Sequence, residues 1–121
     1  MKILIADDDI DAADSLAVLV RVVLDADVCV FYDAESALAS AGDYRPDAVV
    51  LDINMPGMDG FQTARRLKKD RRLERKPFIA HTAAADDPLV RKIARRVGFK
   101  HVISKGDADY VTTLIDLLAE V

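Results

Sequence analysis

The residue with the clearest chemical potential in this sequence is Asp52, which ends an apolar run. Residues 48–51 are Ala-Val-Val-Leu, a pattern typical of a parallel strand that is covered on both faces. The segment Met55-Pro56-Gly57 follows and prevents the strand from continuing. A carboxylate at the carboxyl end of such a strand lies where open α/β sheets bind ligands. Asp52 alone leaves two interpretations open, a reactive carboxylate or a cap for the following loop.

Other polar residues stand at the ends of other apolar runs. Asp7 and Asp8 follow the first run of the chain, and Thr82 and Lys105 follow two later ones. Three carboxylates in one place repel each other, and ionising all of them is costly without a cation. Hard oxygen ligands suit Mg²⁺, which keeps several waters and takes only one or two carboxylates directly. The pattern predicts a magnesium site at which Asp52 remains free to react.

The predicted reaction at Asp52 is transfer of a phosphoryl group. Aspartate is a nucleophile for phosphoryl groups and forms an aspartyl phosphate. The metal and the Lys105 ammonium would bracket the phosphoryl oxygens, and the Thr82 hydroxyl could donate a hydrogen bond to a third. Such catalysis consists mostly of positioning and charge neutralisation.

Alternating strands and helices must bring these residues together. Short apolar runs predict the strands, and apolar stripes at helical spacing with capping residues predict the helices. The expected strands are 3–6, 28–32, 48–51, 78–81 and 102–104. The first expected helix starts at Asp11 and buries Leu16, Leu19, Val20 and Val23; the last buries Leu114, Leu117, Leu118 and Val121. The second follows Asp33 and ends at Gly42, and the third runs from Gly60 to about Lys69. The fourth follows Asp87 and ends at Gly98.

Five strands alternating with five helices predict an α/β fold, a parallel sheet with helices on both faces. For this number of elements the common doubly wound, flavodoxin-like order is 2-1-3-4-5. That order makes the first and third strands neighbours, so Asp7 and Asp8 should face Asp52. Thr82 and Lys105 should lie at the same edge of the sheet.

Composition limits the classes of function. The 121 residues predict one domain, with a net charge of −4 that argues against nucleic-acid binding. The single cysteine, Cys29, cannot form an internal disulfide, and we expect it to be a small core residue. We find no signal-peptide h-region and no apolar run that could span a bilayer, so the expectation is a soluble, cytoplasmic protein without membrane partners.

Four short motifs in this chain resemble the signature set of response-regulator receiver domains, the CheY-like modules of two-component phosphorelay systems. They are Ile5-Ala6-Asp7-Asp8, the segment from Val50 to Gly60 (Val-Leu-Asp-Ile-Asn-Met-Pro-Gly-Met-Asp-Gly), Thr82-Ala83 and Ser104-Lys105. Each motif is weak alone, but together they follow the order and spacing of the family. The resemblance covers the whole chain, which predicts a receiver domain over residues 1–121.

The resemblance implies a phosphoacceptor signalling module that changes its binding to an unknown downstream protein. Asp52 would receive its phosphoryl group from a histidine kinase or a histidine phosphotransfer protein. Asp8 and Asp52 would bind Mg²⁺ through carboxylates, Asp7 through water and Asn54 through its backbone carbonyl. Thr82 would follow the phosphoryl group and Lys105 would pair with it. Such a chain catalyses only its own phosphorylation and dephosphorylation, and direct DNA binding is not expected.

The sequence departs from the family pattern at two positions. Gly106 follows Lys105 where the family usually has a proline with a cis bond, and a trans bond is expected here because a cis non-proline bond costs about 2.5–4 kcal/mol. Val102 stands where receivers usually carry Tyr or Phe, the ring that swings inward on activation. Val102 is therefore an atypical switch position that cannot make the usual motion.

Two rival functions and several structural interpretations remain. The first rival is a Mg²⁺-dependent phosphohydrolase with an aspartyl nucleophile, against which Asn54 stands where a second acid would be needed. The second is a degenerate receiver that binds partners constitutively.

We expect Asp9 and Asp59 to be helix caps, and we assign no catalytic role to His81 or His101. Twelve of the 17 basic residues lie between residues 65 and 96 and form either solvated helix faces or a docking surface for an acidic partner. Weak contact with nucleic acid is a third interpretation, but no recognition helix or aromatic platform supports it.

Overall fold

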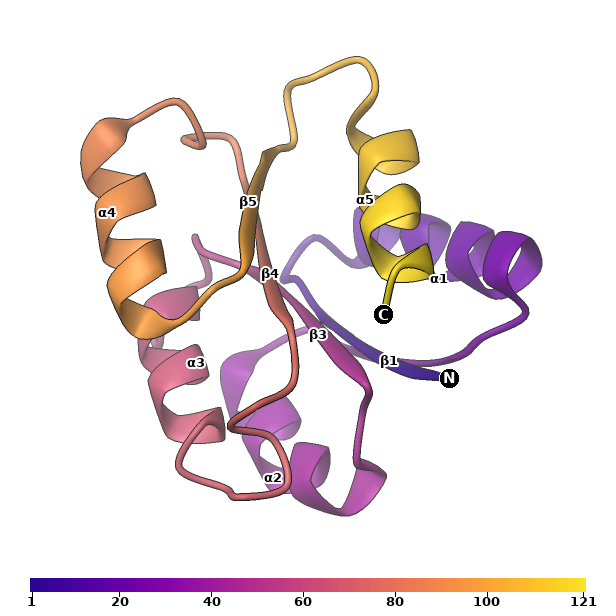
Figure 1. Ribbon diagram of the computed structural model, residues 1–121, viewed down its shortest axis with the longest axis horizontal. Helices are drawn as coiled ribbons and strands as arrows, with labels where there is room; N and C mark the ends of the chain where they lie inside the picture. The colour runs from indigo at the N-terminus through magenta and orange to yellow at the C-terminus, as the bar shows by residue number, and fades with distance from the viewer.

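A computed structural model describes residues 1–121, and its centre is a five-stranded parallel sheet (Figure 1). The strand order is β2-β1-β3-β4-β5, as predicted. The sequence prediction placed all five strands to within one residue at each end. The strands are β1 (Lys2–Ala6), β2 (Asp27–Phe31), β3 (Ala48–Asp52), β4 (Phe78–Thr82) and β5 (His101–Ser104).

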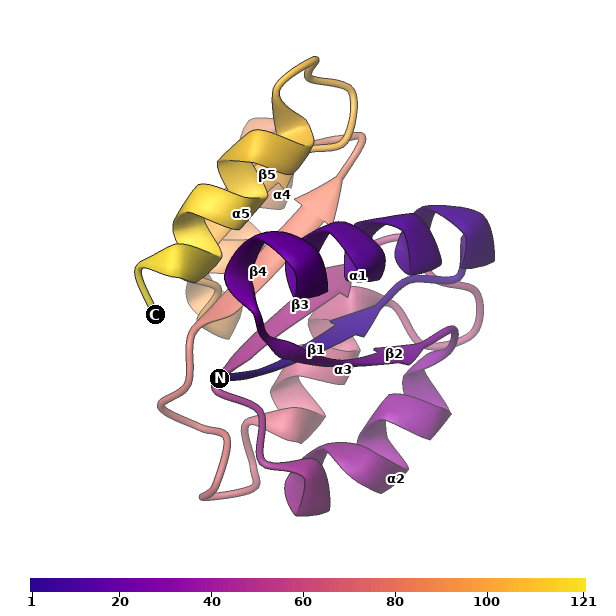
Figure 2. The same cartoon turned by 90° about the vertical axis from the view of Figure 1, so that its right-hand side faces the viewer.

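Helices cover both faces of this sheet. Helices α1 and α5 lie side by side on one face, as Figure 2 shows, and α2, α3 and α4 cover the other (Figure 1). No helix of this chain has both the length and the apolar character needed to cross a membrane. The helices are α1 (Ile10–Leu24), α2 (Ala34–Tyr44), α3 (Gly60–Leu67), α4 (Pro88–Val97) and α5 (Tyr110–Ala119).

The strands are apolar because both faces of the sheet are buried. Alternate side chains of each strand point to opposite faces, so the sheet divides the core in two. On the α1 and α5 face, Ile3, Val50 and Leu114 belong to one cluster of buried residues. On the other face, Leu4, Leu51 and Phe78 belong to a second cluster. Each helix therefore gains its stability mainly by covering one of these clusters.

Aspartate side chains begin four of the five helices. Each accepts a hydrogen bond from a backbone N–H in the first turn, which satisfies a donor that the helix itself leaves unpaired. Asp9 and Asp59 act in this way, which confirms their prediction as caps. Asp33 and Asp87 cap the two remaining helices of this group, and Gly98 ends α4 with a positive φ of 108°, as predicted.

The predicted apolar stripe of α1 is wrong at two positions. Leu16 and Val20 are buried, but Leu19 and Val23 are 42% and 58% exposed. The buried face of α1 instead includes Ala13 and Ala17 beside Leu16 and Val20. The helix carries more apolar residues than one face can bury, so spacing alone did not select the inner ones.

The predicted end of α2 at Gly42 is also wrong. The helix continues to Tyr44 and ends at Arg45, which has a positive φ of 55°. A Cβ at Gly42 would lie 2.6 Å from Asp70 Oδ2 and closer still to the Arg72 guanidinium, so these two side chains would have to move to accommodate it. The glycine thus marks a close approach between α2 and the loop after α3, not a helix end.

Three smaller predictions need correction. Val121 lies beyond α5 and is exposed, because α5 ends at Ala119. Helix α3 ends at Leu67 and the chain continues in turns, so Lys69 lies outside it. Cys29 is only half-buried, because β2 is an edge strand of the sheet.

The register of the strands brings their carboxyl ends to one edge. Ala6 of β1 lies opposite Leu51 of β3, so Asp7 and Asp52 follow at the same level. Asp52 in turn pairs with His81, and Thr82 pairs with Ser104, the residue before Lys105. The predicted polar residues therefore meet at this edge.

Candidate functional site: an acidic cluster with one lysine

Three carboxylates gather at the carboxyl edge of the sheet. Oxygen atoms of Asp7, Asp8 and Asp52 all lie within 4.8 Å of one another. Asp7 and Asp52 are 1% and 4% exposed, whereas Asp8 is exposed. Lys105 Nζ lies 2.8 Å from Asp7 Oδ2 and 3.2 Å from Asp52 Oδ2, so one ammonium bridges the two buried carboxylates.

Of the two buried carboxylates, Asp7 has its negative charge better balanced by hydrogen-bond donors and positive charge. Burial alone would raise its pKa, but hydrogen bonds from Lys105 and from the backbone N–H of Asp9 outweigh burial and lower the pKa. The Asp9 N–H donates to Asp7 Oδ1 over 3.0 Å. Both oxygens of Asp7 therefore have a donor, which keeps this carboxylate ionised.

The negative charge of Asp52 is less well balanced by its neighbours. Burial raises the pKa of Asp52 to about 7, and the negative charge of Asp7 adds to that effect, while Lys105 opposes it. One backbone donor reaches Asp52, the Asn54 N–H at 3.1 Å from Oδ1. Asp52 is thus the carboxylate with the greatest gain from an added cation or a bond that removes its charge.

The cluster fits a divalent cation by charge and by ligand type. Three carboxylates and one ammonium give a formal charge of −2 when all are ionised. Carboxylate oxygens are hard ligands of the kind that Mg²⁺ takes, and exposed Asp8 leaves one side of the cluster open to water. Burial and the neighbouring Asp7 raise the pKa of Asp52, so an added cation would favour its ionised form.

Thr82 and Asn54 lie beside the acids and contact each other. Thr82 Oγ1 accepts hydrogen bonds from the Asn54 side-chain amide at 3.4 Å and from the Ala84 backbone N–H at 3.1 Å. Because both contacts use the hydroxyl oxygen as acceptor, its proton is available to donate to a group at Asp52. Asn54 itself is exposed, and its backbone N–H is already bonded to Asp52.

The pairing of His81 with Tyr110 near the acids was not predicted from the sequence. His81 is buried behind Asp7, with Nε2 3.6 Å from Asp7 Oδ2. Its Nδ1 is paired with the hydroxyl of Tyr110, the first residue of α5. The available signal was the position of His81, a polar residue inside an otherwise apolar strand. Nothing in the local sequence indicated Tyr110, because the contact spans 29 residues.

The two atypical positions differ in their surroundings. The chain has no cis peptide bond, so the bond before Gly106 is trans, as expected. Val102 is half-buried and lines a groove of about 340 Å³ between α4, β5 and α5, together with Phe99 and Leu117. The small side chain leaves this space open where an aromatic ring would occupy part of it.

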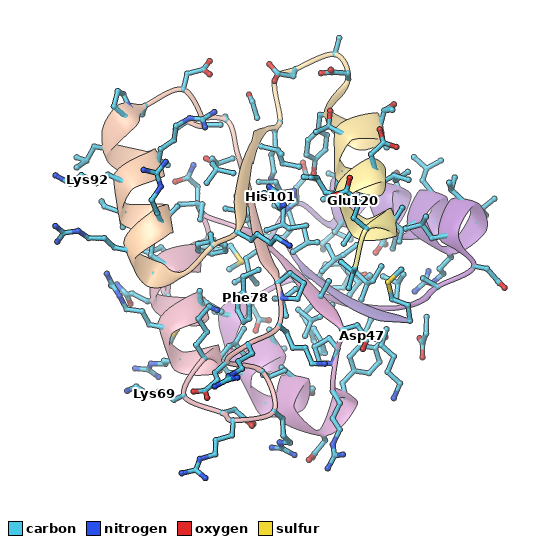
Figure 3. The ribbon with its side chains drawn as sticks, viewed as in Figure 1. Asp47, Lys69, Phe78, Lys92, His101 and Glu120 are labelled. Carbon is cyan, nitrogen blue, oxygen red and sulfur yellow. The ribbon has the colours of Figure 1, made fainter.

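Most basic side chains belong to α3, the turns after it and α4. Lys69 and Lys92 extend outward from the α3 and α4 side in Figure 3, which also places His101 on β5. His101 lines the groove beside Val102 and does not join the acidic cluster.

Comparison with known proteins identifies the family. The family model described as the response regulator receiver domain matches residues 3–116. The chain is 35% identical over 85 residues to the DNA-binding response regulator MtrA of Mycolicibacterium paratuberculosis, which is 70% of this chain and 36% of that protein. It thus spans about a third of the length of this relative.

Solved structures show the same fold. The chemotaxis protein CheY4 of Vibrio cholerae superposes with a TM-score of 0.88 and 25% identity, over 99% of this chain and 97% of that one. The receiver domain of the sensor histidine kinase PA1611 of Pseudomonas aeruginosa, with a magnesium ion coordinated in its active-site cleft, has a TM-score of 0.82 and 24% identity over 98% and 94%. The chain belongs to the response regulator receiver domains, the phosphoacceptor signalling modules of two-component systems.

Proposed function

We propose that Asp52 accepts a phosphoryl group in a Mg²⁺-dependent reaction, with the phosphohistidine of a histidine kinase or histidine phosphotransfer protein as donor. The observation that carries this proposal is the acidic cluster bridged by Lys105. Asp52 is the one acid of the buried pair that lacks full compensation, and it ends the central strand of the sheet. The chain also belongs to the response regulator receiver domains, and the resemblance of its motifs to that family supports the same assignment.

In the transfer, an oxygen of the Asp52 carboxylate forms a bond to phosphorus as the P–N bond to the donor imidazole breaks. The imidazole leaves with the electron pair of that bond and takes a proton from solvent. The product is an acyl phosphate on Asp52. The buried position of Asp52 at 4% exposure excludes most water from the reacting oxygen, while exposed Asp8 keeps the entrance polar.

The ligands of the proposed Mg²⁺ are Asp7, Asp8, Asp52 and the backbone carbonyl of Asn54. When bound, the ion would neutralise charge on the phosphoryl oxygens during transfer. The fit rests on the formal charge of −2 and the oxygen-rich cluster. A cation here would also favour the ionised form of Asp52, the form that acts as nucleophile.

Lys105 and Thr82 are the proposed charge partner and hydrogen-bond donor of the phosphoryl group. Lys105 Nζ already contacts Asp52 Oδ2 at 3.2 Å, so a small rotation of its side chain would bring it to an oxygen bound to phosphorus. Thr82 has its oxygen fixed by two donors and its proton available. Both groups would stabilise charge that the transfer places beside Asp52.

The proposed role is signalling and not turnover of a separate substrate. The chain would catalyse only its own phosphorylation and dephosphorylation, in the cytoplasm, and the phosphorylated form would bind an unknown downstream protein differently. The basic surface does not contribute to the acidic cluster, and this domain offers no nucleic-acid recognition element. We therefore assign no DNA binding to these 121 residues.

Incubation with acetyl phosphate and Mg²⁺ tests this proposal. Intact-mass spectrometry should show one added phosphate that is stable in acid and labile in base. Peptide mapping should place it on Asp52, and Asp52→Asn should remain unmodified while Asp59→Asn, with its carboxylate in a helix cap, should not lose the modification. A phosphate mapped to Ser, Thr or His, or one that forms equally well with excess chelator, would exclude the proposed reaction.

A further inference from the structure

His81 is a buried polar side chain beside the acids for which the proposed phosphotransfer gives no role. It precedes Thr82 on β4 and is 1% exposed. Its ring stacks on that of Tyr110, with 18° between the planes and 5.9 Å between centroids. One nitrogen, Nδ1, is paired with the Tyr110 hydroxyl, but Nε2 has no hydrogen-bond partner of ordinary geometry; it lies 3.6 Å from Asp7 Oδ2, and the Ala6 backbone is a second neighbouring acceptor. An unpartnered nitrogen this deeply buried requires an explanation.

The position of the imidazole proton follows from its neighbours. A neutral imidazole has one N–H, so one nitrogen donates and the other accepts. If the proton were on Nδ1, the lone pair of Nε2 would face the Asp7 carboxylate across 3.6 Å, which is repulsive. With the proton on Nε2, the N–H points toward the carboxylate and Nδ1 accepts from the Tyr110 hydroxyl. The arrangement favours the second tautomer, which Tyr110 fixes.

Lys105 already donates to the Asp7 oxygen that lies nearest to this N–H. Asp7 Oδ2 already accepts from Lys105 Nζ at 2.8 Å, and Asp7 Oδ1 accepts from the Asp9 N–H at 3.0 Å. His81 Nε2 stands behind Lys105 at 3.6 Å from the same Oδ2. To reach an ordinary N–H···O distance of about 2.9 Å, Nε2 needs to approach by roughly 0.7 Å.

From this geometry we propose that His81 is a positioning residue that replaces Lys105 as the donor to Asp7 when the lysine turns to a phosphorylated Asp52. The replacement keeps Asp7 paired and fixed in orientation while its former partner serves the phosphoryl group. This step rests on the proposed function, because it needs Lys105 to leave Asp7. The availability of His81 to donate does not depend on that function.

The approach of the His81 ring to Asp7 would also affect α5. Because Tyr110 is the first residue of α5 and holds Nδ1, a shift of the His81 ring toward Asp7 displaces the hydrogen bond at the start of that helix. This connection runs on the α1 and α5 face of the sheet, where His81 follows Ile79 by two residues. Val102 packs against the core of the opposite face. The His81–Tyr110 pair therefore supplies a route to α5 that does not use Val102.

Nuclear magnetic resonance of the ¹⁵N-labelled full chain tests the proposal. Imidazole ¹⁵N shifts should identify the Nε2–H tautomer of His81 in the free protein. Lys105→Met removes the ammonium and keeps an apolar chain of similar length. In this variant the Nε2–H proton should move downfield as it bonds to Asp7, without any phosphoryl group. Saturation of the wild type with beryllium fluoride and Mg²⁺ should cause the same shift and should also perturb the amides at the start of α5.

A matched pair of tyrosine variants separates the connection from simple packing. Tyr110→Phe keeps the stacked ring and removes the hydroxyl, so the tautomer preference and the shifts in α5 should be lost while those at Asp52 and Thr82 remain. Tyr32→Phe removes a hydroxyl that donates to Asp14 on α1 and has no contact with the His81–Tyr110 pair, so it should change neither.

The outcomes distinguish this inference from the proposed function. An Nδ1–H tautomer in the free chain, or an unchanged His81 in Lys105→Met, overturns the role of His81. Unchanged α5 shifts in Tyr110→Phe overturn the connection to that helix. If beryllium fluoride perturbs neither Asp52 nor Thr82, the proposed function fails, and the Lys105→Met result still decides whether His81 can replace the lysine.

Discussion

Asp7 and Asp52 are nearly equally buried, yet their carboxyl groups have opposite electrostatic tendencies. Asp7 has a donor on each oxygen, and its pKa is lowered because Lys105 and the Asp9 N–H outweigh burial. Asp52 shares the ammonium at a longer distance, and burial raises its pKa to about 7. The site thus keeps one acid as a fixed ligand and leaves the other in need of a cation.

Removing the charge of Asp52 should stabilise the metal-free protein. Asp52→Asn keeps the acceptor for the Asn54 N–H and removes the repulsion from Asp7, so we expect the melting temperature at pH 8 with chelator to rise by about 4 °C, equivalent to about 1 kcal/mol for a chain of this size. Scanning calorimetry measures this change. Asp11→Asn, in the exposed first turn of α1, is the control and should not raise the melting temperature. A lower melting temperature for Asp52→Asn would show that the carboxylate is already compensated.

The raised pKa of Asp52 also predicts how the stability of the fold changes with pH. The pKa of Asp52 is raised in the folded state to about 7, above the value near 3.9 for an unfolded chain. The proton bound to Asp52 therefore stabilises the fold fully below about pH 4, and this contribution is lost as pH rises through about 7.

His81 acts in the opposite direction over part of that range. Burial and Lys105 lower the pKa of His81 to about 4, so stability from its neutral form is lost as pH falls from about 6.5 toward that value. The measurement is therefore the difference in urea unfolding free energy between wild type and Asp52→Asn, without metal, from pH 4.5 to 8. The stability advantage of the variant should grow with pH, and a difference that does not change with pH would contradict the raised pKa.

The elements position the acids through short, tightly packed connections. Between β3 and α3, the Gly60 N–H donates to the carbonyl of Ile53 at 2.9 Å, so α3 begins directly against the residue after Asp52. A Cβ on Gly60 would lie 2.4 Å from the Asp52 carbonyl oxygen and 2.8 Å from Ile53 Cα. Because both contacts are to backbone atoms, the glycine is required for α3 to approach the site.

Substitution of Gly60 should therefore disturb both stability and the site. Gly60→Ala must displace either α3 or the backbone at Asp52, and overpacking of this kind costs about 1–3 kcal/mol. Chemical denaturation should show this loss, and the yield of phosphate from acetyl phosphate should fall with it. Gly106→Ala is the matched control, because its Cβ would meet Ser104 Oγ at an ordinary 3.6 Å, and it should change stability by less than about 0.5 kcal/mol. Equal effects of the two substitutions would mean that the close approach at Gly60 is unimportant.

At the scale of the whole molecule, the sheet separates two apolar cores and collects polar groups at one edge. Leu114 and Phe78 are each fully buried, on opposite faces. The acids come from β1 and β3, and the lysine follows β5, so the site depends on strands from both ends of the chain. The Lys105–Asp7 contact spans 98 residues, and unfolding of any part of the sheet would abolish it.

Magnesium binding should for this reason stabilise the entire fold. A ligand that binds only the folded state stabilises it by about 1.4 kcal/mol at a tenfold excess over Kd and about 2.7 kcal/mol at a hundredfold excess. We expect Mg²⁺ to raise the melting temperature of wild type by about 5 °C at the tenfold excess. Asp8→Asn, which removes a ligand of the cluster, should reduce the effect, and the Asp11→Asn control should retain it. A wild type that does not respond to Mg²⁺ would count against the site.

The sequence by itself determined the fold class, the strand order and the residues that meet at the edge of the sheet. It could do so because buried parallel strands are short apolar runs, and because aspartates mark the starts of four of the five helices by local hydrogen bonding. The capping roles of Asp9 and Asp59 followed from the same local rules.

Only the tertiary structure decided which apolar residues of α1 are inside, because that depends on what packs against the helix. It also decided the opposite pKa shifts of Asp7 and Asp52, because the two buried carboxyl groups have different hydrogen-bond donors and charged neighbours, among them the sequence-remote ammonium of Lys105. The contact of His81 with Tyr110 is of the same kind, since it joins side chains from β4 and α5 across 29 residues. Local patterns select elements, but packing between distant elements determines burial, charge and the partners of each polar atom.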